Sequence, residues 1–339
     1  IESVRVGGTC VLRGCVPKKL LVYGAHIAHD LEDAAGFGWN IGSIEHDWLK
    51  LINAKDKELD RLNSIYLSLL SKVDIIEGFG KIVSNSEVEV NGNIIRSNKI
   101  LIAVGGKPFL PEIRGIDLCI NSDQALDLKS LPKKIIINGG GYIALEFASI
   151  FASFGSDVTL IYRGKNLLRG FDADISNLIK EECIKNNIKI LTETQINSVS
   201  KTNNGLSVML NNKEEIFSNE VMFATGRIPN TSGLGLNELG IKTGEVGEII
   251  VDKNNKTNKN NIYAIGDVTN RINLTPVAIA EGQVFSDNFF GGMSKVCDYD
   301  NVASAVFSQP AIGVVGLNEL EASNLYANDG GIEVFKTSF

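Results

Sequence analysis

The chain has 339 residues, of which 44% are apolar and 22% are charged, and its net charge is −7. This composition is typical of a globular protein with room for two or more cores. The acidic balance and the lack of a basic stripe argue against nucleic acid or an anionic membrane as partners, and no apolar run is long enough to span a bilayer.

Two cysteines lie five positions apart in the segment GGTCVLRGCVPKK, residues 7–19. In a regular helix, positions five apart differ by about 7.5 Å in height and point in different directions, whereas a disulfide needs Cα atoms within roughly 7 Å. Cys10 and Cys15 can therefore pair only where the chain departs from a regular helix, which Gly14 allows. Pro17 suits the first turn of a helix, so Cys15 is predicted at a helix N-terminus with a lowered pKa.

Other interpretations of this pair stay open. Cysteines in a C-x4-C pattern commonly pack as small apolar side chains, and a metal site would need further Cys or His ligands at regular spacing. The flanking glycines and lysines favour a labile, redox-active pair. The remaining cysteines are irregularly spaced and are expected to be buried, inert thiols of a protein from a reducing compartment: Cys119, Cys183 and Cys297.

The segment GGTCVLRGCVPKK resembles the redox-active segment of the FAD-dependent pyridine nucleotide-disulfide oxidoreductases. Its GCVPKK ending and the VLRG between the cysteines are most similar to the plant and bacterial glutathione reductases within that family. The resemblance implies an α/β fold with two Rossmann-like dinucleotide-binding domains, for FAD and NADPH, and an α+β dimer-interface domain. It also implies that Cys10 attacks the substrate, that Cys15 faces the flavin, and that Lys18 holds positive charge beside it.

Two helices are predicted next, over residues 17–33 and 47–72, from apolar side chains at helical spacing. Tyr66 on the second helix is by default a boundary aromatic. However, LNSIY resembles the family's helix whose tyrosine contacts the disulfide substrate, which implies Ile65 and Tyr66 as substrate contacts. Three histidines lie in this region without the flanking residues of a catalytic base: His26, His29 and His46.

Strands are predicted around the Asn91-Gly92 turn, a strong hairpin signal, and over residues 99–104, a buried apolar run. A later strand, 261–268, ends in a Gly-Asp pair, and a helix begins at Thr275. In the family the strand at 99–104 contacts FAD and the aspartate binds its ribityl chain. A buried aspartate at a strand end otherwise needs hydrogen-bond partners. The FAD contacts that the resemblance implies are Gly8, Thr9, Cys10, Lys18, Gly80, Ala103, Gly105, Arg227, Asp267, Leu274 and Thr275.

A dinucleotide-binding pattern follows. An apolar strand at 135–137 leads into GGGYIA, which fits G-x-G-x-x-A, and a helix (142–154) and a second strand (158–162) come next. Such glycines let the backbone approach a pyrophosphate at the helix N-terminus. An NAD site would carry an acid after the second strand, whereas Arg163 and Arg169 stand there, which suits the 2′-phosphate of NADPH.

Surface solvation is the plainer interpretation of these arginines, and the spacing by itself also allows FAD. The position of the unit after the redox cysteines resembles the NADPH domain of the family. By that resemblance Tyr142 covers the nicotinamide pocket and Glu146 pairs with Lys18, although a boundary aromatic and a first-turn acid are simpler alternatives. The implied NADPH contacts are Gly139, Gly141, Tyr142, Ile143, Ala144, Glu146, Arg163, Arg169 and Gly226.

The resemblance divides the chain into residues 1–105 of the FAD domain, 106–229 as the NADPH domain, 230–300 as the return to the central FAD domain, and 301–339 as the start of the dimerisation domain. No G-x-G-x-x-G unit precedes Gly7, and the family's catalytic His-Glu pair is expected beyond Phe339. We therefore expect part of a longer homodimeric enzyme from the cytoplasm, a plastid or a mitochondrion.

The expected activity is NADPH-dependent reduction of glutathione disulfide through FAD and the Cys10–Cys15 disulfide, with no metal. Related substrates stay open: trypanothione, a glutathione amide, mercuric ion, and dihydrolipoamide, whose enzymes use NAD and are disfavoured by Arg163. Gln283 replaces an arginine of some glutathione reductases, which leaves a substrate-carboxylate contact there open. Alternatives of other classes are an inactive NADPH-binding module and a metal-binding thiol protein.

Overall fold

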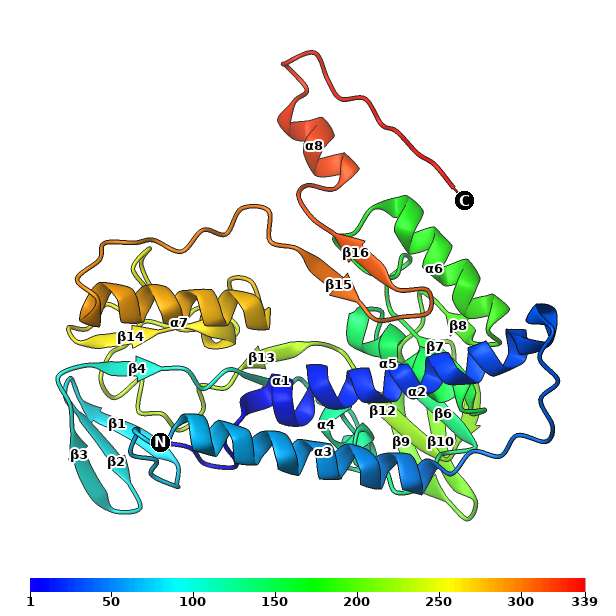
Figure 1. Ribbon diagram of the computed structural model, residues 1–339, viewed down its shortest axis with the longest axis horizontal. Coiled ribbons are helices and arrows are strands. Elements are labelled where there is room, and N and C mark those ends of the chain that lie inside the picture. The colour runs from blue at the N-terminus through cyan, green and yellow to red at the C-terminus, as the bar shows by residue number, and fades with distance from the viewer. Residues whose placement is uncertain (339) are drawn as a thin grey trace. The chain divides into compact units, whose positions relative to one another are not determined.

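The computed structural model describes residues 1–338, which form the helices and strands of Figure 1. They make up two compact units, each assembled from separated stretches of chain. The first unit consists of Ile1–Lys18, Ile52–Phe109 and Gly226–Tyr299. The second consists of Lys19–Leu51, Leu110–Thr225 and the residues from Asp300 on.

The two N-terminal cysteines lie on consecutive helices, α1 (Gly8–Arg13) and α2 (Cys15–Asp33). Gly14 lies between the two helices. A residue with a side chain would not fit there, because its Cβ atom would lie 2.9 Å from the carbonyl oxygen of Thr9. The predicted departure from regular helix at this glycine is confirmed. Helix α2 begins at Cys15, two residues before the predicted start, so Cys15 does stand at a helix N-terminus.

The helical region continues with a 3-10 helix, η1 (Ala34–Phe37), and a long helix, α3 (Trp48–Leu69). Gly38 ends η1 with a φ of 85°, a left-handed conformation that glycine adopts without steric cost. Helix α3 lies inside the range predicted from its apolar spacing, and its last turn is shorter than predicted.

The first unit contains small sheets in place of one large one. Strands β1 (Gly80–Ser84), β2 (Glu87–Val90) and β3 (Asn93–Arg96) form an antiparallel sheet. The predicted hairpin is confirmed at Asn91 and Gly92, whose φ angles of 51° and 78° are those of a tight turn between paired strands. Two further pairs join distant stretches of chain: β4 (Ile100–Ile102) with β14 (Ile262–Ala264), in parallel, and β5 (Gly106–Pro108) with β13 (Arg227–Pro229), antiparallel.

Two strands are shorter than the sequence predicts. The run 99–104 forms only β4, which pairs with the equally short β14. The run 261–268 leaves the sheet after Ala264, because Gly266 has a φ of 71° and starts a 3-10 helix, η3 (Gly266–Thr269). Helix α7 (Thr275–Phe290) follows, as predicted. The buried core of this unit consists of Ile82, Ile100, Ile102, Leu234, Leu236, Ile241, Ile249, Ile262, Ala264 and Val268.

The second unit is built on a parallel sheet in the order β12 (Glu220–Phe223), β6 (Lys134–Asn138), β7 (Asp157–Ile161), β8 (Lys189–Leu191). Helix α5 (Tyr142–Ser153) connects β6 to β7, and α6 (Ala173–Lys185) connects β7 to β8 (Figure 1). The predicted strand, glycine turn, helix and strand are confirmed. Most of α5 is buried, since the parallel strands it covers are themselves apolar.

The remaining elements surround this sheet in the second unit. An antiparallel sheet is formed by β9 (Ile196–Thr202), β10 (Gly205–Leu210) and β11 (Glu215–Ser218). Short elements complete the unit: η2 (Ile116–Leu118), α4 (Ser122–Ala125), β15 (Ser304–Val306), β16 (Ile312–Val314) and α8 (Glu319–Leu325). Among the described residues, no helix is both long enough and apolar enough to cross a membrane.

Candidate active site

The Cys10 and Cys15 thiols face each other across the break between α1 and α2, and both are free. The Cys10 thiol donates a hydrogen bond to Cys15, and this bond is the largest cause lowering the Cys15 pKa to about 6. Burial opposes the shift, while Thr275 and the charge of Lys18 reinforce it. The same hydrogen bond, together with burial, raises the pKa of Cys10 well above its ordinary 9.0. The reduced pair is therefore one thiolate, on Cys15, held by one thiol, on Cys10.

A second helix end approaches this thiolate. The Oγ1 atom of Thr275 lies 3.8 Å from the Sγ atom of Cys15, and Thr275 is the first residue of α7. Helix N-termini carry partial positive charge, so Cys15 lies at the start of α2 and beside the start of α7. The sequence predicted Thr275 only as an FAD contact. Its role beside the thiol depends on a contact across 260 positions, for which the local sequence holds no signal.

Lys18 and Glu146, the other two predicted catalytic residues, are both buried, with exposed fractions of 8% and 2%. Lys18 lies one turn into α2, where its backbone N–H donates to the carbonyl of Gly14 and its charge favours the Cys15 thiolate. Glu146 lies on α5 in the second unit, and its Oε1 accepts a hydrogen bond of 2.9 Å from the backbone N–H of Phe307. The pairing of Lys18 with Glu146 stays a prediction.

Several predicted FAD contacts come together in the first unit where β5 pairs with β13. The Arg227 guanidinium donates a hydrogen bond of 2.5 Å to the carbonyl of Gly106. Asp267 lies next to Gly106, within 3.5 Å of where a Cβ would be. Burial raises the pKa of this carboxyl, and the charge of Arg227 lowers it. A half-buried carboxylate beside a cation is a suitable acceptor for ligand hydroxyl groups.

The backbone around these residues leaves room for a flat ligand. Gly8 and Gly105 have φ angles of 68° and 67°, and nothing lies within 4 Å of the position of a Cβ at either residue. Glycine thus provides open backbone in a conformation that side chains rarely adopt. Open glycines together with the Asp267 carboxylate and the α7 N-terminus fit FAD. The other predicted contacts are Thr9 in α1, Gly80 packed against Ile1, exposed Ala103 after β4, and Leu274 as the N-cap of α7.

In the second unit, the three glycines before α5 differ in what surrounds them. A Cβ at Gly139 would lie 2.3 Å from the carbonyl oxygen of Ala224, and one at Gly140 would lie 2.5 Å from the Tyr162 ring. At Gly141 nothing lies within 4 Å. The first two glycines are therefore required for packing, and the third leaves the N-terminus of α5 open to a phosphate.

Arg163 and Arg169 are both exposed and lie in the loop after β7. This loop is held against the glycine turn, because the backbone N–H of Leu168 donates a 2.8 Å hydrogen bond to the carbonyl of Gly140. Leu168 is buried, which fixes the loop further. Tyr142 at the start of α5 is 43% exposed, as a residue at a binding surface would be. Ile143 is half-buried and Ala144 is buried, and Gly226 lies in the first unit, just before β13.

The predicted substrate contacts Ile65 and Tyr66 lie on α3, with 40% and 38% of their surfaces exposed. Two of the histidines make structural contacts: His29 Nε2 lies 3.1 Å from Ser153 Oγ, and the His46 ring packs against Phe154. Burial raises the pKa of each remaining cysteine, as expected of inert thiols: Cys119, Cys183 and Cys297. The described residues contain no group of three or more His, Cys, Asp or Glu side chains arranged to hold a metal ion.

Comparison with known proteins identifies a matching family and similar relatives. Residues 1–282 match the family described as pyridine nucleotide-disulphide oxidoreductase. The chain is 43% identical over its whole length to a glutathione reductase of Burkholderia cepacia, and 48% identical over 98% of its length to the chloroplastic/mitochondrial glutathione reductase of Pisum sativum. It spans 75% of the first relative and 61% of the second.

A solved structure gives the same result at the level of the fold. The HOCl-induced flavoprotein disulfide reductase RclA from Escherichia coli superimposes with a TM-score of 0.86 and 29% sequence identity, over 97% of this chain and 72% of that one. The family match covers both the cysteine helices and the glycine turn before α5. The chain therefore belongs to the pyridine nucleotide-disulphide oxidoreductases, and has their mixed α/β flavoprotein fold.

Proposed function

We propose that this chain forms most of an NADPH-dependent flavoenzyme that reduces glutathione disulfide. The observation that carries the proposal is the Cys10–Cys15 pair, whose thiol pKa values are shifted in opposite directions beside two helix N-termini. The two relatives named glutathione reductase, at 43% and 48% identity, support this substrate. The 29% identity to RclA supports the disulfide reductase class more broadly.

Enzymes of this family use FAD and NADPH, and the flavin, when bound, supplies the two-electron step between the nicotinamide and the cysteine disulfide. In this chain, the Asp267 carboxylate and the open backbone at Gly8 and Gly105 would hold FAD. Gly141 and the α5 N-terminus would bind the NADPH pyrophosphate, and Arg163 and Arg169 would bind its 2′-phosphate. The charge of Arg227 lowers the pKa of the Asp267 carboxyl and so offsets part of the rise that burial causes.

The cysteines then perform thiol-disulfide exchange. Two electrons and one proton convert the Cys10–Cys15 disulfide to the Cys10 thiol and the Cys15 thiolate, the state described above. Cys10 forms a bond to one sulfur of the substrate disulfide, the substrate S–S bond breaks, and the Cys10 proton leaves with the first thiol. The Cys15 thiolate next attacks Cys10, which reforms the protein disulfide and releases the second thiol as a thiolate.

Cys10 is suited to attack the substrate by its raised pKa, and Cys15 is suited to the second step by its lowered pKa. A thiol with a raised pKa is a strong nucleophile once its proton departs, because intrinsic nucleophilicity rises with pKa. The low pKa of Cys15 keeps the second thiolate ready at neutral pH. Lys18 stabilises that negative charge from within the same helix, and exposed Ile65 and Tyr66 on α3 would contact the substrate.

The finer parts of the proposal concern assembly and location. We assign the second unit's parallel sheet to NADPH and the first unit to FAD, and we expect a homodimer, as the family resemblance implies. The buried thiols of Cys119 and Cys183 accord with a reducing compartment such as the cytoplasm. A plastid or a mitochondrion would also fit, and the relative from Pisum sativum is chloroplastic/mitochondrial.

The proposed activity is tested by NADPH oxidation in the full-length protein with glutathione disulfide, trypanothione disulfide, a glutathione amide disulfide and oxidised lipoamide as rival substrates. The proposal predicts the highest kcat/KM for glutathione disulfide, and a strong preference for NADPH over NADH. Turnover that is as fast with another disulfide, or with NADH, would contradict it.

A further inference from the structure

A polar cluster in the first unit lies directly behind the turn that carries Asp267. Glu281, in the second turn of α7, is only 1% exposed. One of its oxygens, Oε2, accepts a 2.6 Å hydrogen bond from the backbone N–H of Gly266, and the other accepts a 2.6 Å bond from the Tyr299 hydroxyl. A buried carboxylate is costly unless it is paired, so a group this well satisfied fixes the position of its partners.

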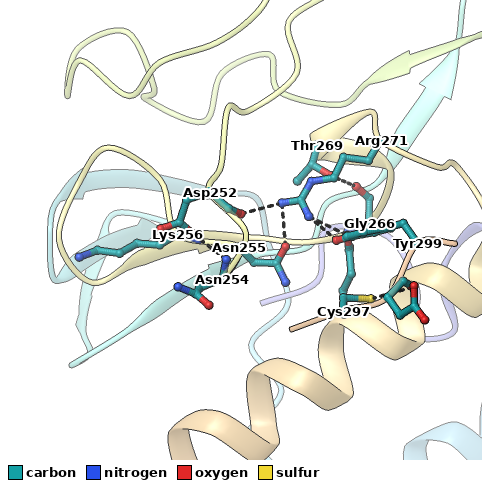
Figure 2. Close-up of polar contacts among 11 residues, drawn as sticks. Asp252, Asn254, Asn255, Lys256, Gly266, Thr269, Arg271, Cys297 and Tyr299 are labelled. Atoms are coloured by element: carbon teal, nitrogen blue, oxygen red, sulfur yellow. Dashed lines mark hydrogen bonds and ion pairs between the residues drawn. The ribbon is translucent and has the colours of Figure 1, made fainter. Parts of the chain in front are cut away.

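Arg271 completes the cluster. Its guanidinium lies 3.6 Å from Glu281 Oε1 and donates a hydrogen bond to the Tyr299 hydroxyl. Figure 2 shows the same guanidinium directed toward the carbonyl of Asp252 and the side chain of Asn255, to which it donates bonds of 3.1 and 2.9 Å. Arg271 therefore supplies the charge that balances Glu281 and joins the 252–255 loop to it.

The turn that Glu281 holds is unusual. Gly266 has a φ of 71°, and a Cβ there would lie 3.2 Å from Ala278 on α7, so the backbone is both left-handed and closely packed. Asp267 follows immediately as the second residue of η3. Movement of the Gly266 backbone would therefore carry the Asp267 carboxylate with it. The Glu281 charge also contributes, as the smallest of several causes, to raising the pKa of Asp267.

We propose that Glu281, braced by Tyr299 and Arg271, is a positioning residue for the Gly266-Asp267 turn and thereby sets the affinity of the protein for FAD. This inference rests on the proposed function, in which Asp267 binds the flavin. Glu281 acts on the flavin site through its hydrogen bond to the backbone of Gly266.

The test is FAD affinity, measured by removing FAD from the holoprotein and titrating FAD back while following the quenching of its fluorescence. Glu281→Leu leaves the Gly266 N–H without its acceptor, and we expect FAD affinity to fall about tenfold or more. Glu281→Gln keeps an acceptor and restores affinity to within about threefold of wild type. The matched control is Asp287→Asn on the same helix, which removes the charge of a half-buried carboxylate that pairs with Lys295 and accepts a hydrogen bond from Gln283, and which should leave FAD affinity unchanged.

A second variant keeps the proposal testable where Glu281→Leu does not fold. Tyr299→Phe removes one hydrogen bond to Glu281 and keeps the ring that the Arg271 guanidinium covers at 5.2 Å. We expect FAD affinity to fall about threefold to tenfold, with the NADPH affinity unchanged. Two results would overturn the role of Glu281 while leaving the proposed function intact. One is an FAD affinity equal to wild type in both Glu281→Leu and Tyr299→Phe, and the other is a loss of FAD affinity in Asp287→Asn as large as that in Glu281→Leu. A wild-type protein that does not bind FAD overturns the proposed function as well.

Discussion

The sulfur of Cys15 lies 3.8 Å from the hydroxyl of Thr275, although 260 positions separate the two residues in the chain. Each is the first residue of its helix, so α2 and α7 both direct N-terminal N–H groups into this region. A thiolate is the group that such a site favours, and the Cys15 pKa of about 6 agrees with it.

The first prediction concerns the hydrogen bond from Cys10, the largest cause of the lowered Cys15 pKa. In Cys10→Ala the donor is lost, so the Cys15 pKa should rise from about 6 toward its ordinary 9.0. In the matched Cys10→Ser, the hydroxyl still donates and the pKa should stay low. The pH dependence of alkylation by iodoacetamide measures both. Equal midpoints in the two variants would mean that the bond does not control the thiolate.

The second prediction follows from linkage between pKa and stability. Because folding lowers the pKa of Cys15, its contribution to stability is present above pH 9 and is lost as the pH falls toward about 6. Folding raises the pKa of Cys10, so that contribution is present below pH 9 and is lost as the pH rises further. The stability of the reduced protein relative to Cys15→Ser should therefore increase between pH 6 and 9, as urea unfolding measures. A flat difference would contradict the assignment of the thiolate to Cys15.

The third prediction separates the packing role of one glycine from the ligand role of another. In Gly139→Ala the new Cβ meets the Ala224 carbonyl at 2.3 Å, in a backbone with a φ of 152°, and the folded state should lose about 2 kcal/mol or more. Gly141→Ala adds its methyl group to open space, so the unfolding temperature should hardly change. NADPH affinity should nevertheless fall about tenfold or more, because the methyl group takes the place of the pyrophosphate. Thermal unfolding and NADPH titration check both, and an unchanged NADPH affinity in Gly141→Ala would contradict this site.

The fourth prediction concerns the choice of nicotinamide cofactor. Arg163→Glu should raise the KM for NADPH roughly 10- to 100-fold, because a charge-assisted hydrogen bond of about 1.5–3 kcal/mol is lost, and should narrow the gap to NADH. Lys165→Glu is the matched control, since it makes the same charge change in the same exposed loop. A similar effect of both substitutions on KM would indicate general charge attraction in place of a specific contact with the 2′-phosphate.

Local patterns predicted the parts of the fold that depend on neighbours in the chain. The hairpin at Asn91-Gly92 follows from two residues that adopt positive φ readily. The unit of β6, α5 and β7 was predictable because an apolar strand, a glycine turn, a largely apolar helix and a second strand follow one another in the sequence. The break at Gly14 was predictable because a pair of cysteines five apart cannot face each other on a regular helix.

What the sequence did not reveal depends on contacts between distant positions. The ends of β4 and β14 are set by their mutual pairing, across about half the chain, so both were predicted too long. Neither the Glu281 bond to Gly266 nor the Glu146 bond to Phe307 has a local signature, because each carboxylate sits in an ordinary helical pattern. Buried charges of this kind become visible only when their partners are known.

The most direct test of the central claim is the visible absorption spectrum of the FAD-loaded protein after addition of NADPH. With Cys15 as the thiolate beside oxidised flavin, wild type should develop a long-wavelength charge-transfer band when NADPH reduces its disulfide. Cys10→Ser has no disulfide and should show the band before NADPH is added, and Cys15→Ser should show it neither before nor after. Only wild type should then turn over glutathione disulfide. A band that persists in Cys15→Ser, or sustained turnover by Cys10→Ser, would contradict the roles assigned to the two cysteines.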